Sequence, residues 1–271
     1  MQHKLIAFIG AGNMTQAIIH GLLNSGYPAG NIVASNPSPA KLERLAAWGV
    51  RTTHDNRAAA ESAEMVVLAV KPQLMATACA DIADLDFSRK LLLSIAAGIS
   101  VQRLTQLLPS AVAVIRVMPN TPSLLSAGMA GLFANAACGQ ADRTFAADLM
   151  QAVGQICWLE QESDINTVIA ASGSSPAYFF LFLEAMQQQI IKMGLDSRTA
   201  RELIQQAMAG AAKMVIDNPQ TDLSTLREQV TSKGGTTAAA IDVFQQHNLN
   251  EIIAKAMQAA VARAQEMETL F

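Results

Sequence analysis

The chain has 271 residues, enough for about two domains at ~100–200 residues each. Hydrophobic residues make up 51% and charged residues 15%, a composition that excludes an intrinsically disordered protein. The formal net charge is -3 and the sequence has no block of basic residues, so we expect no nucleic-acid partner.

Uninterrupted apolar runs such as Met65–Val70 and Leu91–Ile95 are far shorter than the roughly 20 residues that cross a bilayer, so we expect no membrane span. The N-terminus lacks the pattern of a secretory signal, which predicts a cytoplasmic protein.

Cys79, Cys138 and Cys157 have no CxxC or Cys/His ligand spacing. We therefore expect no metal site and cysteines that serve as small buried apolar residues.

The first half of the chain alternates short β-rich runs with amphipathic segments such as Thr15–Leu23 and Lys41–Trp48. This alternation predicts a parallel sheet joined by right-handed crossovers. Several runs are apolar throughout, so both faces of the sheet should be covered. The expected strands are Leu5–Ile9, Ile32–Ala34, Val50–Thr52, Met65–Val70, Leu91–Ile95, Val112–Val117, Met129–Phe133 and Ile156–Leu159.

The strand pattern ends near Glu160, and the rest of the chain is predicted to be helical. Segments such as Ala207–Val215 and Ile252–Ala264 are apolar on more than one side, which one copy of the chain could not cover. We therefore predict an α/β domain over residues 1–160 followed by an all-α dimerisation domain over residues 161–271. The expected helices are Asp164–Ala171, Ala177–Met193, Ser197–Asp217, Leu223–Val230, Thr237–Gln246 and Asn250–Met267.

A glycine-rich segment, Gly10-Ala11-Gly12-Asn13-Met14-Thr15, follows the first strand and opens the first helix. Gly10 permits a tight turn, Gly12 lets the backbone approach a pyrophosphate, and the helix N-terminus presents unpaired N–H groups. Thr15 replaces the third glycine of GxGxxG, and we expect it to loosen the contact between helix and strand. The segment predicts a Rossmann-type dinucleotide site, with an ordinary glycine turn as the alternative.

The end of the second strand bears on the choice of cofactor, because a carboxylate at this place selects the free 2′-hydroxyl of NAD. Here Ser35 and Asn36 are neutral, and Lys41 and Arg44 follow on the next helix. The sequence therefore favours NADPH, with NADH as the alternative.

Two later strand ends, Ala69-Val70-Lys71-Pro72 and Ala96-Ala97-Gly98, should face the same crevice. Lys71 is placed for phosphate or ribose hydroxyls, or else points into solvent. The segment Met118-Pro119-Asn120-Thr121-Pro122 ends the sixth strand with two prolines and should present Asn120 and Thr121 at the rim.

Two segments interrupt the helical half. Small residues at Ser172-Gly173-Ser174-Ser175-Pro176 break the helical pattern, either for close helix packing or for access of a nicotinamide or substrate. The loop Val230–Thr237 contains Gly234 and Gly235, followed by Thr236 and Thr237, and ends at the N-terminus of the predicted helix Thr237–Gln246. Its N–H groups suit a small carboxylate, and an ordinary N-cap is the alternative.

Together these motifs resemble the pyrroline-5-carboxylate reductase family over essentially all 271 residues, and Lys233-Gly234-Gly235-Thr236-Thr237 is the most specific signature. The resemblance implies NAD(P)H-dependent reduction of the cyclic imine 1-pyrroline-5-carboxylate to L-proline, the last step of proline biosynthesis. It also implies an interlocked homodimer, assembled in some members into rings such as decamers.

The resemblance further implies roles for individual residues. Thr237 occupies the position at which the family has a hydroxyl facing the ring nitrogen of the imine substrate. Two residues depart from the family pattern: Lys233 replaces a common proline, and Ser175 replaces a common glycine. The implied cofactor contacts are Gly10, Ala11, Gly12, Asn13, Met14, Ser35, Asn36, Asn56, Ala69, Val70, Lys71, Pro72, Ala96, Ala97 and Gly98, and the implied substrate contacts are Ser232, Gly234, Gly235, Thr236 and Thr237.

Reduction of an imine needs no strong general acid, because the nitrogen can be protonated before hydride arrives. This fits the four histidines, none of which lies in the loop assigned to substrate. A β-hydroxyacid dehydrogenase is one alternative, but it uses a lysine that Ala177–Ile191 does not contain. A non-catalytic NADPH-sensing dimer is another, and the intact loop at 234–237 argues against it.

Overall fold

The computed structural model describes residues 3–270, which form two compact units. The first unit runs to Pro176 and takes in the residues from Ala259 onward, and the second is Ala177–Gln258. The chain therefore passes from one unit to the other inside two helices, α8 (Ser175–Lys192) and α12 (Leu249–Leu270).

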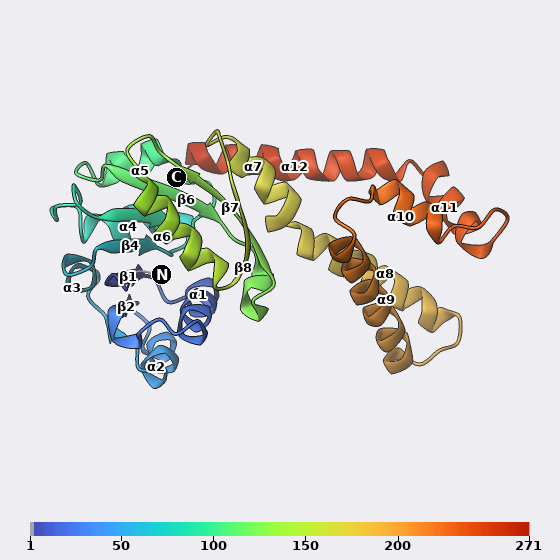
Figure 1. Cartoon of the computed structure of the whole chain (residues 1–271), viewed down its shortest axis with the longest axis horizontal. Helices are drawn as coiled ribbons and strands as arrows, with labels where there is room; N and C mark the ends of the chain where they lie inside the picture. Colours follow the sequence, from blue (N-terminus) through green and yellow to red (C-terminus); the bar gives the residue numbers. More distant parts are fainter. Residues whose placement is uncertain (1–2, 271) are drawn as a thin grey trace. The chain divides into compact units, whose positions relative to one another are not determined.

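The first unit is built on an eight-stranded sheet in the order β3-β2-β1-β4-β5-β6-β7-β8 (Figure 1). All eight strands fall where the sequence predicted them. The order of the strands along the sheet reverses between β1 and β4, and open α/β sheets bind ligands at such a point. The strands are β1 (Ile6–Ile9), β2 (Ile32–Ser35), β3 (Arg51–Thr53), β4 (Met65–Leu68), β5 (Leu91–Ser94), β6 (Ala113–Met118), β7 (Gly128–Ala134) and β8 (Gly154–Trp158).

One junction of the sheet departs from the parallel arrangement, because β6 and β7 are antiparallel. They are joined by a short connection that holds only the 3-10 helix η3 (Thr121–Leu125). A parallel pairing requires a crossover of roughly a dozen residues or more, usually a helix. The α/β class of this unit is confirmed, with β7 and its parallel neighbour β8 reversed relative to the other six strands.

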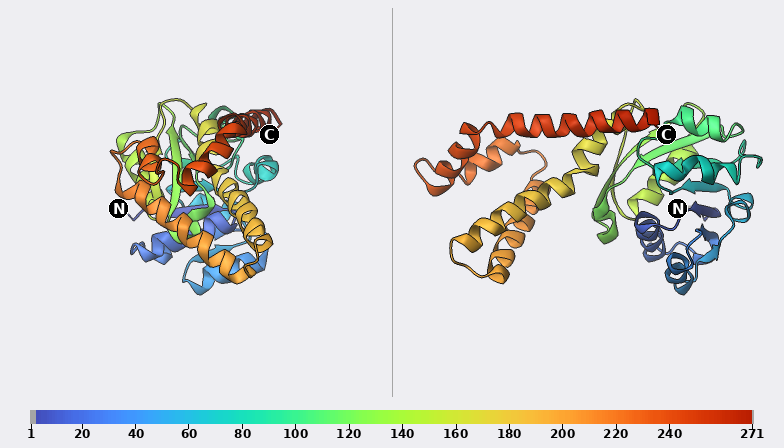
Figure 2. Two further views of the ribbon diagram at one scale, coloured as in Figure 1. Left: turned by 90° about the vertical axis from the view of Figure 1, so that its right-hand side faces the viewer. Right: turned by 180° about the vertical axis from the view of Figure 1, so that it is seen from behind.

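Helices cover both faces of the sheet (Figures 1 and 2), which confirms the prediction from the apolar strands. Along β1, Ile6 and Phe8 enter one buried cluster while Ala7 and Ile9 enter the other. The first cluster includes residues of α1 (Asn13–Asn24), α2 (Pro39–Ala47) and α6 (Gln140–Gln151), and the second includes residues of α3 (Asn56–Glu61), α4 (Met75–Ala80) and α5 (Val101–Leu107).

The small residues near Gly173 do not break the helix. They form a π-helical turn, η4 (Ile169–Gly173), in which the Ser174 amide donates to the carbonyl oxygen of Ile169 at 2.8 Å. The turn joins α7 (Asp164–Val168) to α8, so Asp164–Lys192 is one helix. By length and composition this helix could cross a membrane, which a search for uninterrupted apolar runs missed because serine, glycine and glutamine interrupt it.

The second unit is helical, as predicted. A short turn joins α8 to α9 (Ser197–Asp217) (Figure 2), and Asp196 caps α9 by accepting from the amides of Arg198 and Thr199 at 3.0 Å. The unit also holds α10 (Leu223–Gln229), α11 (Thr236–Gln246) and the start of α12. Large apolar side chains are exposed on it, among them Phe179, Phe180, Leu181, Phe182, Ile216, Val243 and Ile252.

Candidate active site

Gly10 forms the tight turn at the end of β1. Its φ of +106° lies in the region that favours glycine, and a Cβ there would come within 2.6 Å of the Ala69 carbonyl oxygen. The Gly10 amide donates to the Ser35 carbonyl oxygen at 2.8 Å. Only glycine fits this turn, which draws together the ends of β1, β2 and β4.

Gly12 is the N-cap of α1, and its side of the turn is open. A Cβ at Gly12 would meet no atom within 4 Å, so packing within the described chain does not demand glycine here. No side chain among residues 3–270 caps this helix end. A bare backbone followed by uncapped amides of a twelve-residue helix fits the pyrophosphate of a dinucleotide.

At Thr15, where we expected a looser contact between helix and strand, the side chain makes a hydrogen bond to the glycine turn. Its hydroxyl, 1% exposed, donates to the Gly10 carbonyl oxygen at 2.8 Å and so ties the first turn of α1 to the glycine turn. The close backbone approach occurs instead at Gly21, where a Cβ would lie 2.6 Å from the Ala152 carbonyl oxygen. The helix keeps its tight packing, but at a later glycine.

Ser35, Asn36 and Asn56 come together beside this turn. The Ser35 hydroxyl donates to Oδ1 of Asn56 at 2.6 Å, and Nδ2 of Asn56 donates to Asp81 at 2.8 Å. Oδ1 of Asn36 accepts from the Ala11 amide at 3.3 Å. The neutral residues at the end of β2 are thus oriented by hydrogen bonds, and no carboxylate is among them.

Two charged or titratable side chains, His54 and Arg44, lie near the end of β2. His54 is exposed, and its Nδ1 lies 2.8 Å from the Asn36 carbonyl oxygen. Arg44 lies over the Trp48 ring at 5.2 Å, with Nη1 3.5 Å from Oε1 of Gln16 on α1. The sequence could have indicated that His54 lies near the end of β2. His54 directly follows β3, and the ends of neighbouring parallel strands meet at one edge of the sheet.

The two later strand ends follow β4 and β5. Ala69 lies directly against Gly10, and Lys71 is exposed at the start of the 3-10 helix η2 (Pro72–Leu74). After β5, the Ala96 amide donates to the Ser94 hydroxyl at 3.3 Å. Gly98, at φ +70°, lies against Met267 near the C-terminal end of α12, and a Cβ on Gly98 would come within 2.6 Å of the Met267 Cβ.

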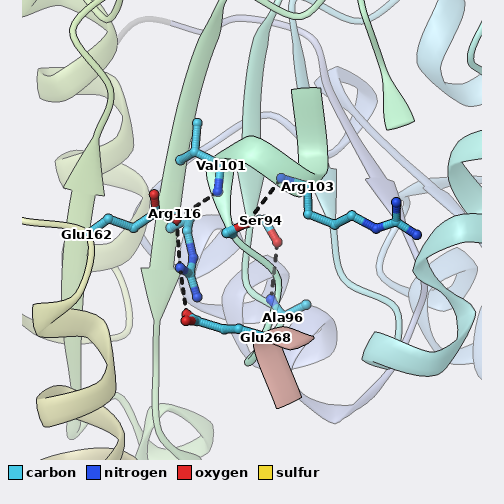
Figure 3. A network of polar contacts seen from close by, with 8 residues as sticks. Ser94, Ala96, Val101, Arg103, Arg116, Glu162 and Glu268 are labelled. Atoms are coloured by element: carbon cyan, nitrogen blue, oxygen red, sulfur yellow. Dashed lines mark hydrogen bonds and ion pairs between the residues drawn. The ribbon is translucent and has the colours of Figure 1, made fainter. Parts of the chain in front are cut away.

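A buried ion-pair network stands beside this loop, and sequence reasoning missed it (Figure 3). Arg116, in the middle of β6, is 2% exposed, and its Nη1 contacts Oε1 of Glu162 at 2.7 Å and Oε1 of Glu268 at 3.2 Å. The same oxygen of Glu162 accepts from the Val101 amide at 2.7 Å. The Nη2 atom of Arg116 is buried without a hydrogen-bond partner among the described residues.

The segment after β6 and the π-helical turn, 52 residues apart, are also in contact. Nδ2 of Asn120 donates to the Ser172 carbonyl oxygen at 3.0 Å, and its Oδ1 accepts from the Met129 amide at 2.9 Å. A Cβ at Gly173 would come within 2.9 Å of the Met118 Cε. These contacts favour the packing interpretation of the small residues around Gly173.

In the second unit, the loop before α11 turns at Gly234, whose φ is +73°. The Gly235 amide donates to the Ser232 carbonyl oxygen at 3.0 Å, and Gly235 is the N-cap of α11 without a side-chain cap. Thr236 and Thr237 are the first two residues of the helix, and both are exposed. The loop thus ends in uncapped amides beside two hydroxyl groups.

Cys79 and Cys138 are buried, as predicted, whereas Cys157 on β8 is only partly buried, so the prediction was wrong for that residue. Burial raises the pKa of Cys79 to about 12 and that of Cys138 to about 11, so neither is a thiolate near neutral pH. Within residues 3–270, no three His, Cys, Asp or Glu side chains are grouped as they would be to hold a metal ion.

Comparison with known proteins assigns families to both halves of the chain. Residues 5–98 match the family model described as NADP oxidoreductase, coenzyme F420-dependent. Residues 162–267 match the model described as pyrroline-5-carboxylate reductase dimerisation.

Individual proteins match along the whole chain. A pyrroline-5-carboxylate reductase of Vibrio alginolyticus is 59% identical over 272 residues and 100% of both chains. The structure of a pyrroline-5-carboxylate reductase from Coxiella burnetii is similar with a TM-score of 0.90, at 40% identity, over 98% of this chain and 99% of that one. The Plasmodium falciparum pyrroline carboxylate reductase, solved with NADP bound, has a TM-score of 0.87 at 26% identity over 99% of each chain.

Proposed function

The chain belongs to the pyrroline-5-carboxylate reductase family and reduces 1-pyrroline-5-carboxylate to L-proline with NAD(P)H. From this premise we propose which residues bind the cofactor and which bind the substrate. The β-hydroxyacid dehydrogenase alternative is not favoured, because the full-length relatives at 54–59% identity are all reductases of this family. We assign cofactor binding to residues 1–160, and dimerisation with substrate binding to residues 161–271.

The proposed cofactor site follows the carboxyl ends of β1, β2, β4 and β5. Gly10 to Met14 would hold the pyrophosphate, and Ser35, Asn36 and Asn56 would contact the adenosine ribose. Ala69 to Pro72 and Ala96 to Gly98 would form the walls of the cofactor site. The open backbone at Gly12 and the uncapped start of α1 support the first assignment. The neutral pair Ser35 and Asn36 supports NADPH as the preferred cofactor, since neither side chain would repel a 2′-phosphate.

The proposed substrate site is the loop of Ser232 and Gly234 to Thr237. The uncapped amides at the start of α11 would bind the substrate carboxylate, because helix N-termini favour anions. The Thr237 hydroxyl would orient the ring nitrogen of the imine. The observation that carries this assignment is the position of Gly235 as an N-cap that offers no side chain to its own helix.

The chemistry needs little acid–base machinery from the chain. The reduced nicotinamide supplies the hydride when the cofactor is bound. The residues of the two sites bind and orient their ligands. The reaction requires the hydride-bearing carbon of the nicotinamide and the imine carbon of the substrate to approach within about 3–3.5 Å. The imine nitrogen can arrive protonated, so no side chain has to deliver a proton as the hydride is transferred.

Replacement of Thr237 tests the substrate assignment. Thr237→Ala should lower kcat or raise the KM for 1-pyrroline-5-carboxylate about tenfold, which corresponds to one lost hydrogen bond of about 1.4 kcal/mol, with the affinity for NADPH unchanged. Thr221→Ala, in the connection between α9 and α10, is the matched control and should behave as the wild type. Wild-type kinetics in Thr237→Ala would refute the assignment.

We also propose that the enzyme is a cytoplasmic homodimer. Exposed apolar side chains on α8, α9, α11 and α12 support a second copy as the partner, since they fall within the segment that matches the dimerisation family model. A second copy, rather than a lipid bilayer, would then cover the apolar helix Asp164–Lys192. Light scattering of detergent-free protein should give the mass of a dimer or of a multiple such as a decamer, and a requirement for detergent would contradict the proposal.

A further inference from the structure

Arg116 is a buried cation that is held by two carboxylates of distant origin. Glu162 precedes α7, and Glu268 lies in the last turn of α12, 152 residues from Arg116 in sequence. The two glutamate side chains are 29% and 27% exposed, so the network sits at the margin of the core. Burying a guanidinium is unfavourable unless anions compensate it, so Arg116 holds both carboxylates in place.

The network of Arg116, Glu162 and Glu268 lies beside both ends of the loop that follows β5. The register of the sheet places Ser94, the last residue of β5, beside Arg116, and the Ser94 hydroxyl accepts from the Ala96 amide. At the other end of the loop, the Val101 amide donates to Glu162. Both ends of the segment 96–101 are therefore fixed by residues of the network or beside it (Figure 3).

The middle of the loop is held by the residue next to Glu268. Met267 covers Gly98 so closely that a Cβ on Gly98 would come within 2.6 Å of the Met267 Cβ. The ion pair of Glu268 with Arg116 fixes the last turn of α12, and that turn packs against Gly98 of the loop.

We propose that Arg116 and Glu268 are positioning residues for the cofactor: they hold the last turn of α12 against Gly98 and so set the wall formed by Ala96 to Gly98. The inference rests on the proposed cofactor site, to which that wall belongs. The last turn of the chain's last helix then contributes to nucleotide affinity without touching the nucleotide, because a small displacement of a binding wall weakens the contacts made with it.

The test compares two glutamates of the same helix in the full-length enzyme. Glu268→Ala removes the contact with Arg116, and Glu266→Ala removes an exposed pair with Arg263 on the same helix. By calorimetric titration with NADPH alone, Glu268→Ala should raise the Kd about fivefold to tenfold, and Glu266→Ala should leave it unchanged. Glu268→Gln keeps an oxygen that can accept from Arg116, and its Kd should stay within about twofold of the wild type.

The KM for 1-pyrroline-5-carboxylate at saturating NADPH separates positioning from a general loss of structure. It should change less than about twofold in Glu268→Ala, because the loop at 232–237 is not part of the network. Equal NADPH affinity in Glu268→Ala and Glu266→Ala would overturn the inference, as would a parallel loss of affinity for both ligands. Gly12→Ala, titrated alongside, identifies which idea fails: if it too retains NADPH affinity, the proposed cofactor site is wrong, and if it alone loses affinity, only the role of Glu268 is wrong.

Discussion

Nδ2 of Asn120 donates a hydrogen bond to the carbonyl oxygen of Ser172 at 3.0 Å. In an uninterrupted α-helix that carbonyl would accept from the amide four residues later, but that residue is Pro176, which has no N–H group. A side chain from the segment after β6 thus replaces the missing backbone donor. The same asparagine accepts from the Met129 amide, so it joins the π-helical turn to the start of β7.

Replacement of Asn120 should therefore destabilise the first unit. Asn120→Ala removes both part-buried hydrogen bonds and leaves the Ser172 carbonyl only its 3.5 Å contact with the Ser175 hydroxyl, so the free energy of unfolding should fall by about 1–3 kcal/mol in urea titrations. Asn218→Ala removes an exposed bond from Nδ2 to the Met214 carbonyl oxygen and should cost less than about 1 kcal/mol. Equal effects of the two substitutions would contradict the role assigned to Asn120.

The two glycine N-caps of the first unit separate ligand binding from folding. Gly12 and Gly139 both precede helices in extended conformation, and neither has an atom within 3.4 Å of the place of a Cβ. Gly12→Ala should change the free energy of unfolding by less than about 1 kcal/mol. Its added methyl group would project toward the proposed pyrophosphate, so its Kd for NADPH should rise at least about tenfold.

Gly139→Ala should leave the Kd for NADPH at the wild-type value in the same titration. If both variants bound NADPH as tightly as the wild type, the glycine at position 12 would have no role in binding.

The hydroxyl of Thr15 gives another test of the glycine turn. Thr15→Val keeps the shape of the side chain but removes the bond to the Gly10 carbonyl oxygen, so stability should fall by about 1–2 kcal/mol. Thr15→Gly restores the third glycine of the motif but loses the same bond, and it should be no more stable than Thr15→Val. A Thr15→Gly protein with a higher midpoint of thermal unfolding than the wild type would contradict this account.

The buried thiols and Tyr27 predict a loss of stability in alkali. Burial raises the pKa of Cys79 from 9.0 to about 12, that of Cys138 from 9.0 to about 11, and that of Tyr27 from 10.0 to about 12. In each case the folded state retains its proton to higher pH than the unfolded state. The stability from these groups is complete below about pH 9 and is lost as the pH rises toward 12.

Urea titrations at a series of pH values check this expectation. The free energy of unfolding should decline between pH 9 and 12, and the decline should be shallower in the double variant Cys79→Ala, Cys138→Ala. Identical slopes in the variant and the wild type would mean that other groups cause the alkaline loss.

Local sequence patterns predicted much of the fold and some of the site for identifiable reasons. The apolar runs of β1, β4 and β5 are buried on both faces, and such runs can be read without knowing their neighbours. The turn at Gly10 follows from the place of the motif between strand and helix. The direction of β7 could not be predicted in this way, because side-chain alternation is the same in parallel and antiparallel strands.

The network of Arg116 could not be predicted from local pattern either. Its partners, Glu162 and Glu268, lie 46 and 152 residues away in sequence, and no periodicity connects them. Asn56 was named only through the family resemblance, and its bond to Ser35 depends on how the ends of β2 and α3 meet. The roles of the residues at the glycine turn and at 232–237 remain predictions.

The central claim is that NADPH bound at the Gly10 to Met14 turn reduces an imine whose carboxylate is held by Gly234 to Thr237. Initial rates of NADPH oxidation, measured over a grid of both substrate concentrations, test it most directly. Gly12→Ala should raise the KM for NADPH alone, whereas Thr237→Ala should lower kcat or raise only the KM for 1-pyrroline-5-carboxylate. If Thr237→Ala raised the KM for NADPH instead, or if both variants kept wild-type kinetics, this division of the chemistry would be wrong.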